Sequence, residues 1–103
     1  MYIPKVTDEK EREILDFIQR RFPKDSDWTT GNCYWFAVIL GNRFFLEKYY
    51  QPKKGHFVAG DGHRFYDWTG RVVDAEDDIP ILYDEMWDTD RTWAARLFRD
   101  CAN

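Results

Sequence analysis

Three residues whose side chains can together carry out nucleophilic catalysis follow one another along this 103-residue chain: Cys33, His56 and Asp67. A cysteine thiolate attacks carbonyl carbons, an imidazole accepts the thiol proton, and a carboxylate fixes the orientation of the imidazole. Each of the three taken alone is more often structural, as a small core residue, a packed histidine or the start of a turn. The elements that carry these residues therefore decide whether the chemistry is available.

Cys33 stands at the predicted start of a buried helix. The run Thr29-Thr30-Gly31-Asn32 is typical of a turn and a helix start, because Thr and Asn side chains satisfy the free N–H groups of a first turn. Nearly all of the next residues are apolar, so the sequence predicts a helix over about 32–42 that is covered on most sides and stops at Gly41-Asn42. The positive end of a helix favours a thiolate over a thiol.

His56 and Asp67 fall on two predicted strands joined by a tight turn. Asp61-Gly62 suits the two central positions of a type I′ turn. A two-residue turn there pairs residue 58 with 65 and places His56 directly opposite Asp67, on one face of the sheet. If the helix lays its N-terminus over that face, Cys33 meets His56. The predicted strands are 48–51, 56–59 and 64–68.

The remaining segments complete an α+β domain. Helical spacing of apolar residues predicts a first helix over 7–22, with Thr7 as its cap, and a last helix that begins at Asp88 or Thr89. Residues 71–73 extend the sheet, and 79–83 form either an edge strand or a turn of helix. The expected fold is one domain, 1–103: an N-terminal helix, a central buried helix carrying Cys33 at its N-terminus, an antiparallel sheet of three or four strands, and a C-terminal helix.

Composition excludes several classes of partner. The net charge is −4 and no basic run exists, which argues against nucleic acid. No apolar run approaches the roughly 18 residues that span a bilayer, and no signal peptide is visible, so we expect no membrane contact and a cytoplasmic location. Cys33 and Cys101 are predicted to be free thiols, with Cys101 packed on the last helix. No CxxC or HxxxH spacing is present, His63 falls in the turn, and we expect no metal and no cofactor.

Aromatic side chains make up 18% of the chain. The simplest explanation is a small core filled with large rings, and an aromatic-lined groove for a ligand is the alternative. Trp28, Asn32 and Trp68 are the candidate substrate-binding residues, because they flank Cys33 and Asp67 in the sequence. Trp28 is either a wall beside Cys33 or a lid over the core.

Three short motifs resemble the core of the papain-like thiol superfamily, most closely its transglutaminase-like and NlpC/P60-like branches. They are Gly31-x-Cys33-x-x-Phe36-Ala37-x-x-Leu40, Gly55-His56-Phe57-Val58 and Tyr66-Asp67-x-Thr69-Gly70. The resemblance covers about residues 28–70. It implies a single papain-like domain in which Cys33 is the nucleophile, His56 the base and Asp67 the orienting residue.

Two functions remain open from the sequence. The first is a small cysteine hydrolase or acyltransferase that attacks an amide or thioester of a peptide or protein substrate through Cys33. The second is a non-catalytic binding module, for instance a mobile-element or inhibitor-type protein that keeps the fold and blocks a host protein. In the enzyme Cys33 faces a cleft with His56 in reach, whereas in the binding module it is sealed in the core. The sequence leaves the oligomeric state open.

Overall fold

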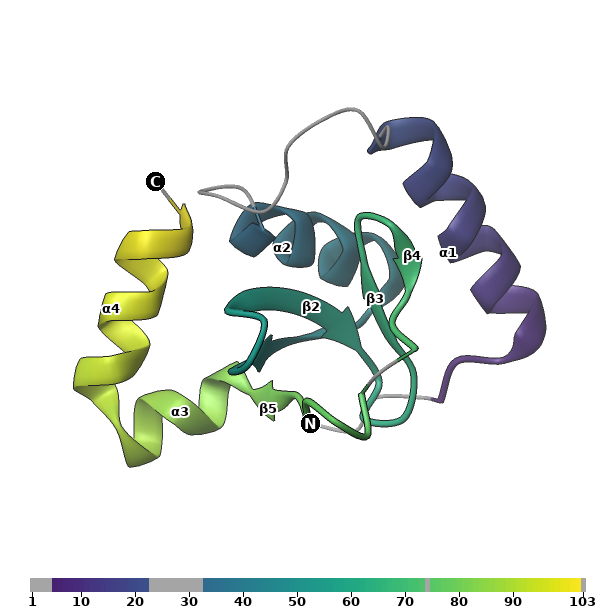
Figure 1. The fold of residues 1–103 in the computed structure, drawn as a ribbon. Helices are drawn as coiled ribbons and strands as arrows, with labels where there is room; N and C mark the ends of the chain where they lie inside the picture. Colours follow the sequence, from purple (N-terminus) through teal and green to yellow (C-terminus); the bar gives the residue numbers. More distant parts are fainter. Residues whose placement is uncertain (1–4, 23–32, 74, 103) are drawn as a thin grey trace.

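The computed structural model describes residues 5–22, 33–73 and 75–102, with side chains up to Arg99. The elements follow in the order helix, helix, strands, helix, helix (Figure 1). The helices are α1 (Asp8–Arg21), α2 (Cys33–Phe44), α3 (Tyr83–Thr89) and α4 (Arg91–Ala102). The strands are β1 (Glu47–Gln51), β2 (His56–Gly60), β3 (Phe65–Asp67), β4 (Gly70–Arg71) and β5 (Ile81–Leu82).

The described strands form one antiparallel sheet in the order β4-β3-β2-β1-β5. Helix α2 lies across this sheet and contacts β1, β2 and β3, while α1 packs beside β4 and α3 beside β1 and β5 (Figure 1). The predicted α+β class is confirmed, with the N-terminal, central and C-terminal helices in their expected places. Within the described residues the sheet has five strands rather than three or four, because β4 and β5 both join it. None of the described helices has the length and apolar character that crossing a membrane requires.

The segment before the last helix differs most from the sequence prediction. Residues 81–82 pair with β1 as β5, and a seven-residue helix, α3, follows directly. The last helix is capped by Asp90, whose carboxylate accepts a hydrogen bond from the N–H of Trp93, rather than by Asp88 or Thr89. Those two residues belong to the end of α3. Two helices, α3 and α4, are therefore present where the sequence analysis predicted one.

Helix α2 ends two residues later than predicted, at Phe44. Phe45 then takes a left-handed conformation, φ 58°, and the N–H of Leu46 donates to the carbonyl of Gly41 at 3.0 Å. This ending brings the main chain back so closely that a Cβ at Gly41 would lie 2.7 Å from the carbonyl oxygen of Leu46. Gly41 is needed for this close approach and does not mark the helix end itself.

The main hydrophobic core lies between α2 and the sheet. Phe36, Ala37 and Leu40 on α2 are fully buried, and so are Phe57 and Ala59 on β2. These positions follow the helical spacing on α2 and the two-residue alternation on β2. The same core reaches α1 through Ile14, Ile18 and Phe22, and α4 through Ala94 and Leu97.

A smaller cluster covers the other face of the sheet. Val58 alternates with Phe57 and Ala59 along β2, and it packs with Phe65 and Val72. Tyr49 packs against this cluster, and its ring contacts that of Phe65 edge-on at 4.9 Å. The five residues of β2 are therefore buried from both sides, as expected for the central strand of a small sheet.

A polar cluster attaches α1 to the hairpin. The carboxylate of Glu11 accepts a hydrogen bond from the buried Tyr66 hydroxyl at 2.8 Å, and it lies 3.4 Å from Arg71 and 3.5 Å from Arg64. Burial, and then the hydrogen bond to Glu11, raise the pKa of Tyr66 well above its usual range. The hydroxyl therefore stays protonated and keeps donating to Glu11, which fixes α1 against β3 and β4.

The turn between β2 and β3 is wider than the sequence predicted. Gly60 pairs with Phe65 and Ala59 with Tyr66, so the loop holds four residues, 61–64, instead of two. The carboxylate of Asp61 causes this, because it accepts main-chain hydrogen bonds inside the loop and from the N-terminal segment. Its donors are the N–H groups of Val6 at 2.6 Å, Arg64 at 2.7 Å and His63 at 2.8 Å.

The carboxylate of Asp61 should make folding sensitive to acid. Burial raises the pKa of Asp61, but the main-chain hydrogen bonds outweigh burial and leave the pKa below its ordinary value of 3.8. Its stabilising contribution is therefore complete above about pH 4 and is lost as the pH falls through the lowered pKa. We expect Asp61→Asn to lower the free energy of unfolding at pH 7 by about 1–2 kcal/mol.

Urea unfolding at pH 7, 4 and 2.5 tests this. The difference between wild type and Asp61→Asn should shrink as the pH falls below 4, because the wild-type carboxylate becomes neutral too. Asp88→Asn, which changes an exposed carboxylate on α3, serves as the matched control and should change stability little. A constant difference across this pH range would contradict the role given to Asp61.

Candidate active site

Cys33 is the first residue of α2, and its side chain is fully buried. Helix α2 and strand β2 contact each other and run in the same direction, so their N-terminal ends lie on the same side of the molecule (Figure 1). Tyr34 confirms the contact, since its ring lies edge-on to that of Phe57 with centroids 5.2 Å apart. The residues that follow Cys33 and His56 therefore touch each other.

His56 and Asp67 are brought together by the sheet. His56 is 7% exposed and Asp67 6%, and Nε2 of His56 lies 3.9 Å from Oδ2 of Asp67. The other carboxylate oxygen of Asp67 accepts hydrogen bonds from the main-chain N–H of Thr69 at 2.8 Å and from its hydroxyl at 2.6 Å. Asp67 is thus held by the turn that follows it, with one oxygen left to face the imidazole.

The predicted register of this pair is wrong by two residues. Continuing the observed pairing of Ala59 with Tyr66 places Asp67 beside Val58 instead of beside His56. A shift of two keeps both side chains on one face, because faces alternate with every residue. His56 and Asp67 are therefore diagonal neighbours, which are within reach of each other when the side chains are long.

Gln51 is the residue directly opposite His56, and it was missed as a site residue. Its side chain is fully buried, and its Oε1 lies 3.0 Å from Nε2 of His56. Its Nε2 donates to the main-chain carbonyl of Asp78 at 3.0 Å. The sequence held a signal for this contact, because a four-residue turn over 52–55 between two strands pairs residue 51 with 56.

Asp78 ends an acidic run of the sequence, yet its side chain is buried, at 4% exposed. Its carboxylate accepts hydrogen bonds from the main-chain N–H groups of Lys53 at 2.9 Å and Lys54 at 3.0 Å. It thereby closes the turn between β1 and β2 and holds its own carbonyl beside Gln51. The chain of contacts runs from Asp78 through Gln51 to His56.

The imidazole of His56 has neighbours from both sides of the sheet, Asp67 on one and Trp68 on the other. By alternation along β2, His56 belongs to the face of Val58, opposite to α2. It is also the first residue of the strand, and its ring lies edge-on to Trp68 with centroids 5.3 Å apart. Trp68 packs against the main core, on the side of α2. Within the described residues no hydrogen bond joins the Cys33 thiol to His56 or Asp67.

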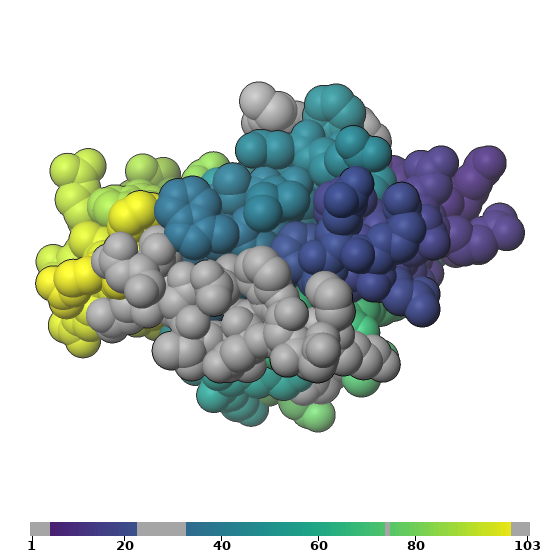
Figure 2. Space-filling model, turned by 90° about the horizontal axis from the view of Figure 1, so that it is seen from above, coloured from purple at the N-terminus to yellow at the C-terminus, as the bar shows by residue number. Residues whose placement is uncertain are grey.

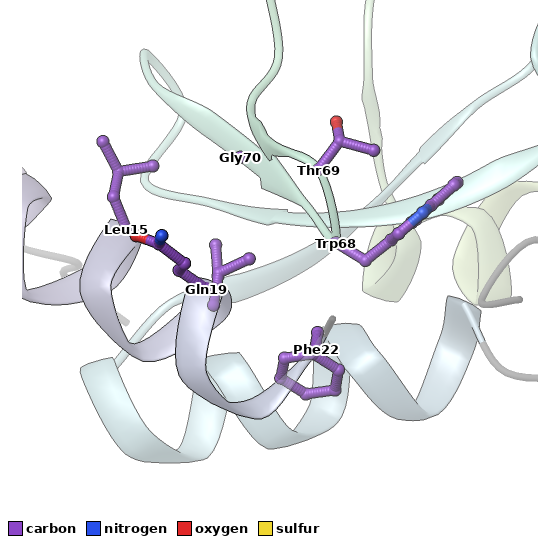
Figure 3. A pocket seen from close by; sticks show the side chains of 7 residues that line it. Leu15, Gln19, Phe22, Trp68, Thr69 and Gly70 are labelled. Atoms are coloured by element: carbon purple, nitrogen blue, oxygen red, sulfur yellow. The ribbon is translucent and has the colours of Figure 1, made fainter. Parts of the chain in front are cut away.

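A pocket of about 620 Å³ lies beside the His56–Asp67 pair, between α1 and the turn from β3 to β4. Figure 3 shows Leu15 and Gln19 on α1, and Phe22 directly after it, across from Trp68, Thr69 and Gly70 of this turn. Trp68 and Thr69 connect the pocket to the pair, because Trp68 contacts His56 and Thr69 binds Asp67. None of the described lining residues is charged, so the pocket suits an uncharged, largely apolar group. The lining is Leu15, Ile18, Gln19, Phe22, Trp68, Thr69 and Gly70.

The remaining candidates of the sequence analysis have mixed outcomes. Trp28 and Asn32 lie outside the described residues, and so does the side chain of Cys101. His63 is exposed in the turn, as predicted, where its N–H donates to Asp61. The structure thus places Cys33, His56, Asp67 and Trp68, and adds Gln51, Asp78 and Thr69 as residues that hold the pair.

Comparison with known proteins gives one match. A family model described as phage YunG-like protein matches residues 14–98, which include α2, the whole described sheet and every described residue of the site. No curated protein and no solved structure matches the chain. Since the match covers well over half of the sequence, the chain belongs to the phage YunG-like protein family.

Proposed function

We propose that this protein is a small cysteine-dependent hydrolase or acyltransferase that acts on an amide or thioester through Cys33, His56 and Asp67. The observation that carries the proposal is the buried imidazole of His56. It is held by Gln51 and Asp67 at the end of β2 that lies beside the N-terminus of α2, where Cys33 begins the helix. A histidine fixed by a neutral acceptor and a carboxylate is the arrangement that a general base requires.

The proposed reaction begins with transfer of the thiol proton of Cys33 to His56. The thiolate attacks the carbonyl carbon of the substrate, a C–S bond forms, and the oxygen becomes an oxyanion. Main-chain N–H groups of the first turn of α2 have no partner within the helix, and they are the proposed donors to this oxyanion. Collapse breaks the bond to the amine or thiol leaving group, which takes the proton from His56.

The acyl group then leaves Cys33 in a second step. Water, or an amine in the transferase reaction, gives a proton to His56 and attacks the thioester carbon. The C–S bond breaks, the acid or new amide is released, and the proton returns to the Cys33 thiolate. Asp67 stabilises the imidazolium that exists between the steps. The apolar pocket beside Trp68 is the proposed place for an uncharged group of the substrate.

Acetyl transfer from p-nitrophenyl acetate tests this function. We expect intact-mass spectra and peptide mapping to show one acetyl group on Cys33 at pH 7, and His56→Ala to slow its formation by about 10²–10⁴-fold. His63→Ala replaces the only other histidine of the chain and should leave the rate unchanged. Acetylation confined to lysines or Cys101, or an unchanged rate in His56→Ala, would rule out the proposed reaction.

A second function is favoured by two other observations. Cys33 is fully buried within the core, as expected for a binding module whose cysteine only packs. Trp35 and Ile39 lie one helical turn apart on α2, and each is 43% exposed. Figure 2 shows α2 at the surface between α1 and α4. In this alternative the protein, carried by a mobile element as the family description suggests, binds a partner protein through α2.

The two functions make opposite predictions for two sets of variants, one in α2 and one at Cys33. If the protein is a binding module, Trp35→Ala with Ile39→Ala removes partner binding and Cys33→Ser changes nothing. If it is an enzyme, Cys33→Ser abolishes acyl transfer and the double variant of α2 retains it. Both sets of variants should fold, because Trp35 and Ile39 are half-exposed and Ser is close to Cys in size.

A further inference from the structure

The two ends of the Gln51 side-chain amide are distinguished by their partners. Its Nε2 lies 3.0 Å from the main-chain carbonyl oxygen of Asp78, and its Oε1 lies 3.0 Å from Nε2 of His56. A main-chain carbonyl can only accept a hydrogen bond, so the end of the amide facing Asp78 must be the NH₂ group. The end facing His56 is therefore a carbonyl oxygen, which also can only accept.

It follows that Nε2 of His56 must be the donor in its contact with Gln51. A neutral imidazole carries hydrogen on only one of its two nitrogens. We propose that Gln51 is a positioning residue that holds neutral His56 in the tautomer protonated at Nε2, so that Nδ1 is the basic nitrogen. Asp67 acts in the same direction, because its carboxylate lies 3.9 Å from the same nitrogen and favours a hydrogen there.

The burial of Gln51 explains why its side-chain amide can hold His56 in only one tautomer. Its side chain is fully buried, so water cannot replace either hydrogen bond if the amide turns over. A turned amide would place an NH₂ group against the donor side of His56 and a carbonyl oxygen against that of Asp78. Both contacts would then be lost, and an unsatisfied buried polar group costs about 1–3 kcal/mol. The amide therefore has one stable orientation.

The catalytic meaning of this inference rests on the proposed function. If His56 is the base that takes the thiol proton of Cys33, Nδ1 is the atom that accepts it, and Gln51 and Asp67 then bind the opposite side of the imidazolium. The proton passes from the sulfur to Nδ1 and later to the leaving group, while the hydrogen on Nε2 stays in place. Gln51 would touch neither the substrate nor the reacting atoms.

NMR of protein labelled with ¹⁵N-histidine tests the tautomer without any substrate. Two-bond proton–nitrogen correlations identify the protonated nitrogen of each ring, and a buried, hydrogen-bonded ring N–H exchanges slowly enough to be observed. For His56 at pH 7.5 we expect a protected hydrogen on Nε2. A neutral ring with its hydrogen on Nδ1 would overturn the inference directly.

Three variants identify Gln51 as the cause. Gln51→Leu keeps the approximate volume but removes the acceptor, and the protected Nε2 hydrogen of His56 should disappear from the spectrum. Gln51→Glu restores the acceptor for His56, although it loses the hydrogen bond to the carbonyl of Asp78, and it should restore the signal. Asp78→Asn keeps the main-chain carbonyl that orients Gln51, so the signal should persist even if stability falls. A protected signal that persists in a folded Gln51→Leu variant would overturn the role of Gln51.

Reactivity separates this inference from the proposed function. In the acetyl-transfer experiment we expect Gln51→Leu to slow acetylation of Cys33 by about tenfold or more, with recovery in Gln51→Glu. Asn42→Leu, which removes an exposed side-chain amide near the end of α2, away from the pocket, should alter neither the spectrum nor the rate. If wild-type Cys33 takes no acetyl group, the proposed function fails while the tautomer is still decided by NMR. If Gln51→Leu changes the spectrum but not the rate, Gln51 is structural only.

Discussion

Iodoacetamide should label Cys33 faster in the folded protein than in the unfolded chain at pH 6.5. In an unfolded chain a cysteine has its ordinary pKa of about 8.5, so only about 1% of it is thiolate at this pH. In the proposed reaction His56 takes the proton of Cys33 in the folded protein, so the nucleophilic form of the sulfur is formed there. This comparison is demanding, because Cys33 is fully buried and a merely packed thiol would react more slowly when folded.

The experiment uses Cys101→Ser, so that Cys33 is the only thiol. Rates are measured by intact mass with and without 8 M urea, from pH 6 to 9. His56→Ala should lower the folded-state rate about tenfold or more at pH 6.5 and hardly at pH 9, where a thiol ionises unaided. Asp67→Asn should give an intermediate loss, because the imidazolium loses its charged neighbour, and His63→Ala should give none.

The other possible outcomes of the labelling experiment each point to a different role for Cys33. Protection of Cys33 in the folded protein would make it a core residue and favour the binding module. Fast labelling that is insensitive to His56→Ala would show an accessible thiol without a base. Neither result would affect the tautomer of His56, which Gln51 determines from the other side of the ring.

Replacing Phe57 by Ala should lower the free energy of unfolding by about 3–5 kcal/mol. Phe57 is fully buried in β2, directly after His56, and three rings surround it edge-on. Their centroids lie 5.2 Å away for Tyr34, 5.2 Å for Tyr50 and 4.9 Å for Tyr83. Since these rings come from α2, β1 and α3, the cavity would weaken the contact of the sheet with two helices at once.

Urea unfolding followed by circular dichroism measures this loss. A domain of this size has a total stability of about 5–15 kcal/mol, so Phe57→Ala should be close to unfolding at 37 °C. Phe57→Leu keeps most of the volume and should cost only about 1–1.5 kcal/mol. Phe45→Ala is the matched control, because Phe45 is 74% exposed, and it should change stability by less than about 0.5 kcal/mol. A loss below 1 kcal/mol in Phe57→Ala would contradict the central place given to this ring.

The helices and strands that carry the site were predicted accurately, because each shows a clear helical or strand-like spacing of its residues. Helical spacing located α1 and α2 to within two residues, and Thr7 caps α1 as expected, accepting from the N–H of Lys10. Strand-like spacing of residues predicted the positions of β2 and β3. The segment 79–83 could not be decided, because Pro80 suits both an edge strand and a helix start, and pairing with β1 makes Ile81 and Leu82 a strand.

The site was predictable in part. The shared face of His56 and Asp67 followed from a turn near Asp61. Their register, however, depends on three hydrogen bonds to the Asp61 side chain, which no sequence pattern indicates. The pairing of Gln51 with His56 could have been inferred from the turn over 52–55, but the burial of Gln51 and Asp78 could not, since glutamine is usually exposed and Asp78 stands in an acidic run. Their roles come from long-range contacts, 24 to 27 residues apart for Asp78, that only the folded chain shows.

The order of the strands also bears on how this protein behaves at high concentration. The two long strands, β1 and β2, are both internal, and the edges of the described sheet are β4 and β5, with two residues each. An unpaired strand edge can recruit the edge of a second molecule and so begin aggregation, and the risk grows with the length of the edge. Edges of two residues offer almost no template, so the folded chain should resist edge-to-edge assembly. Aggregation would then have to begin from molecules in which β4 or β5 has detached and exposed a longer neighbour.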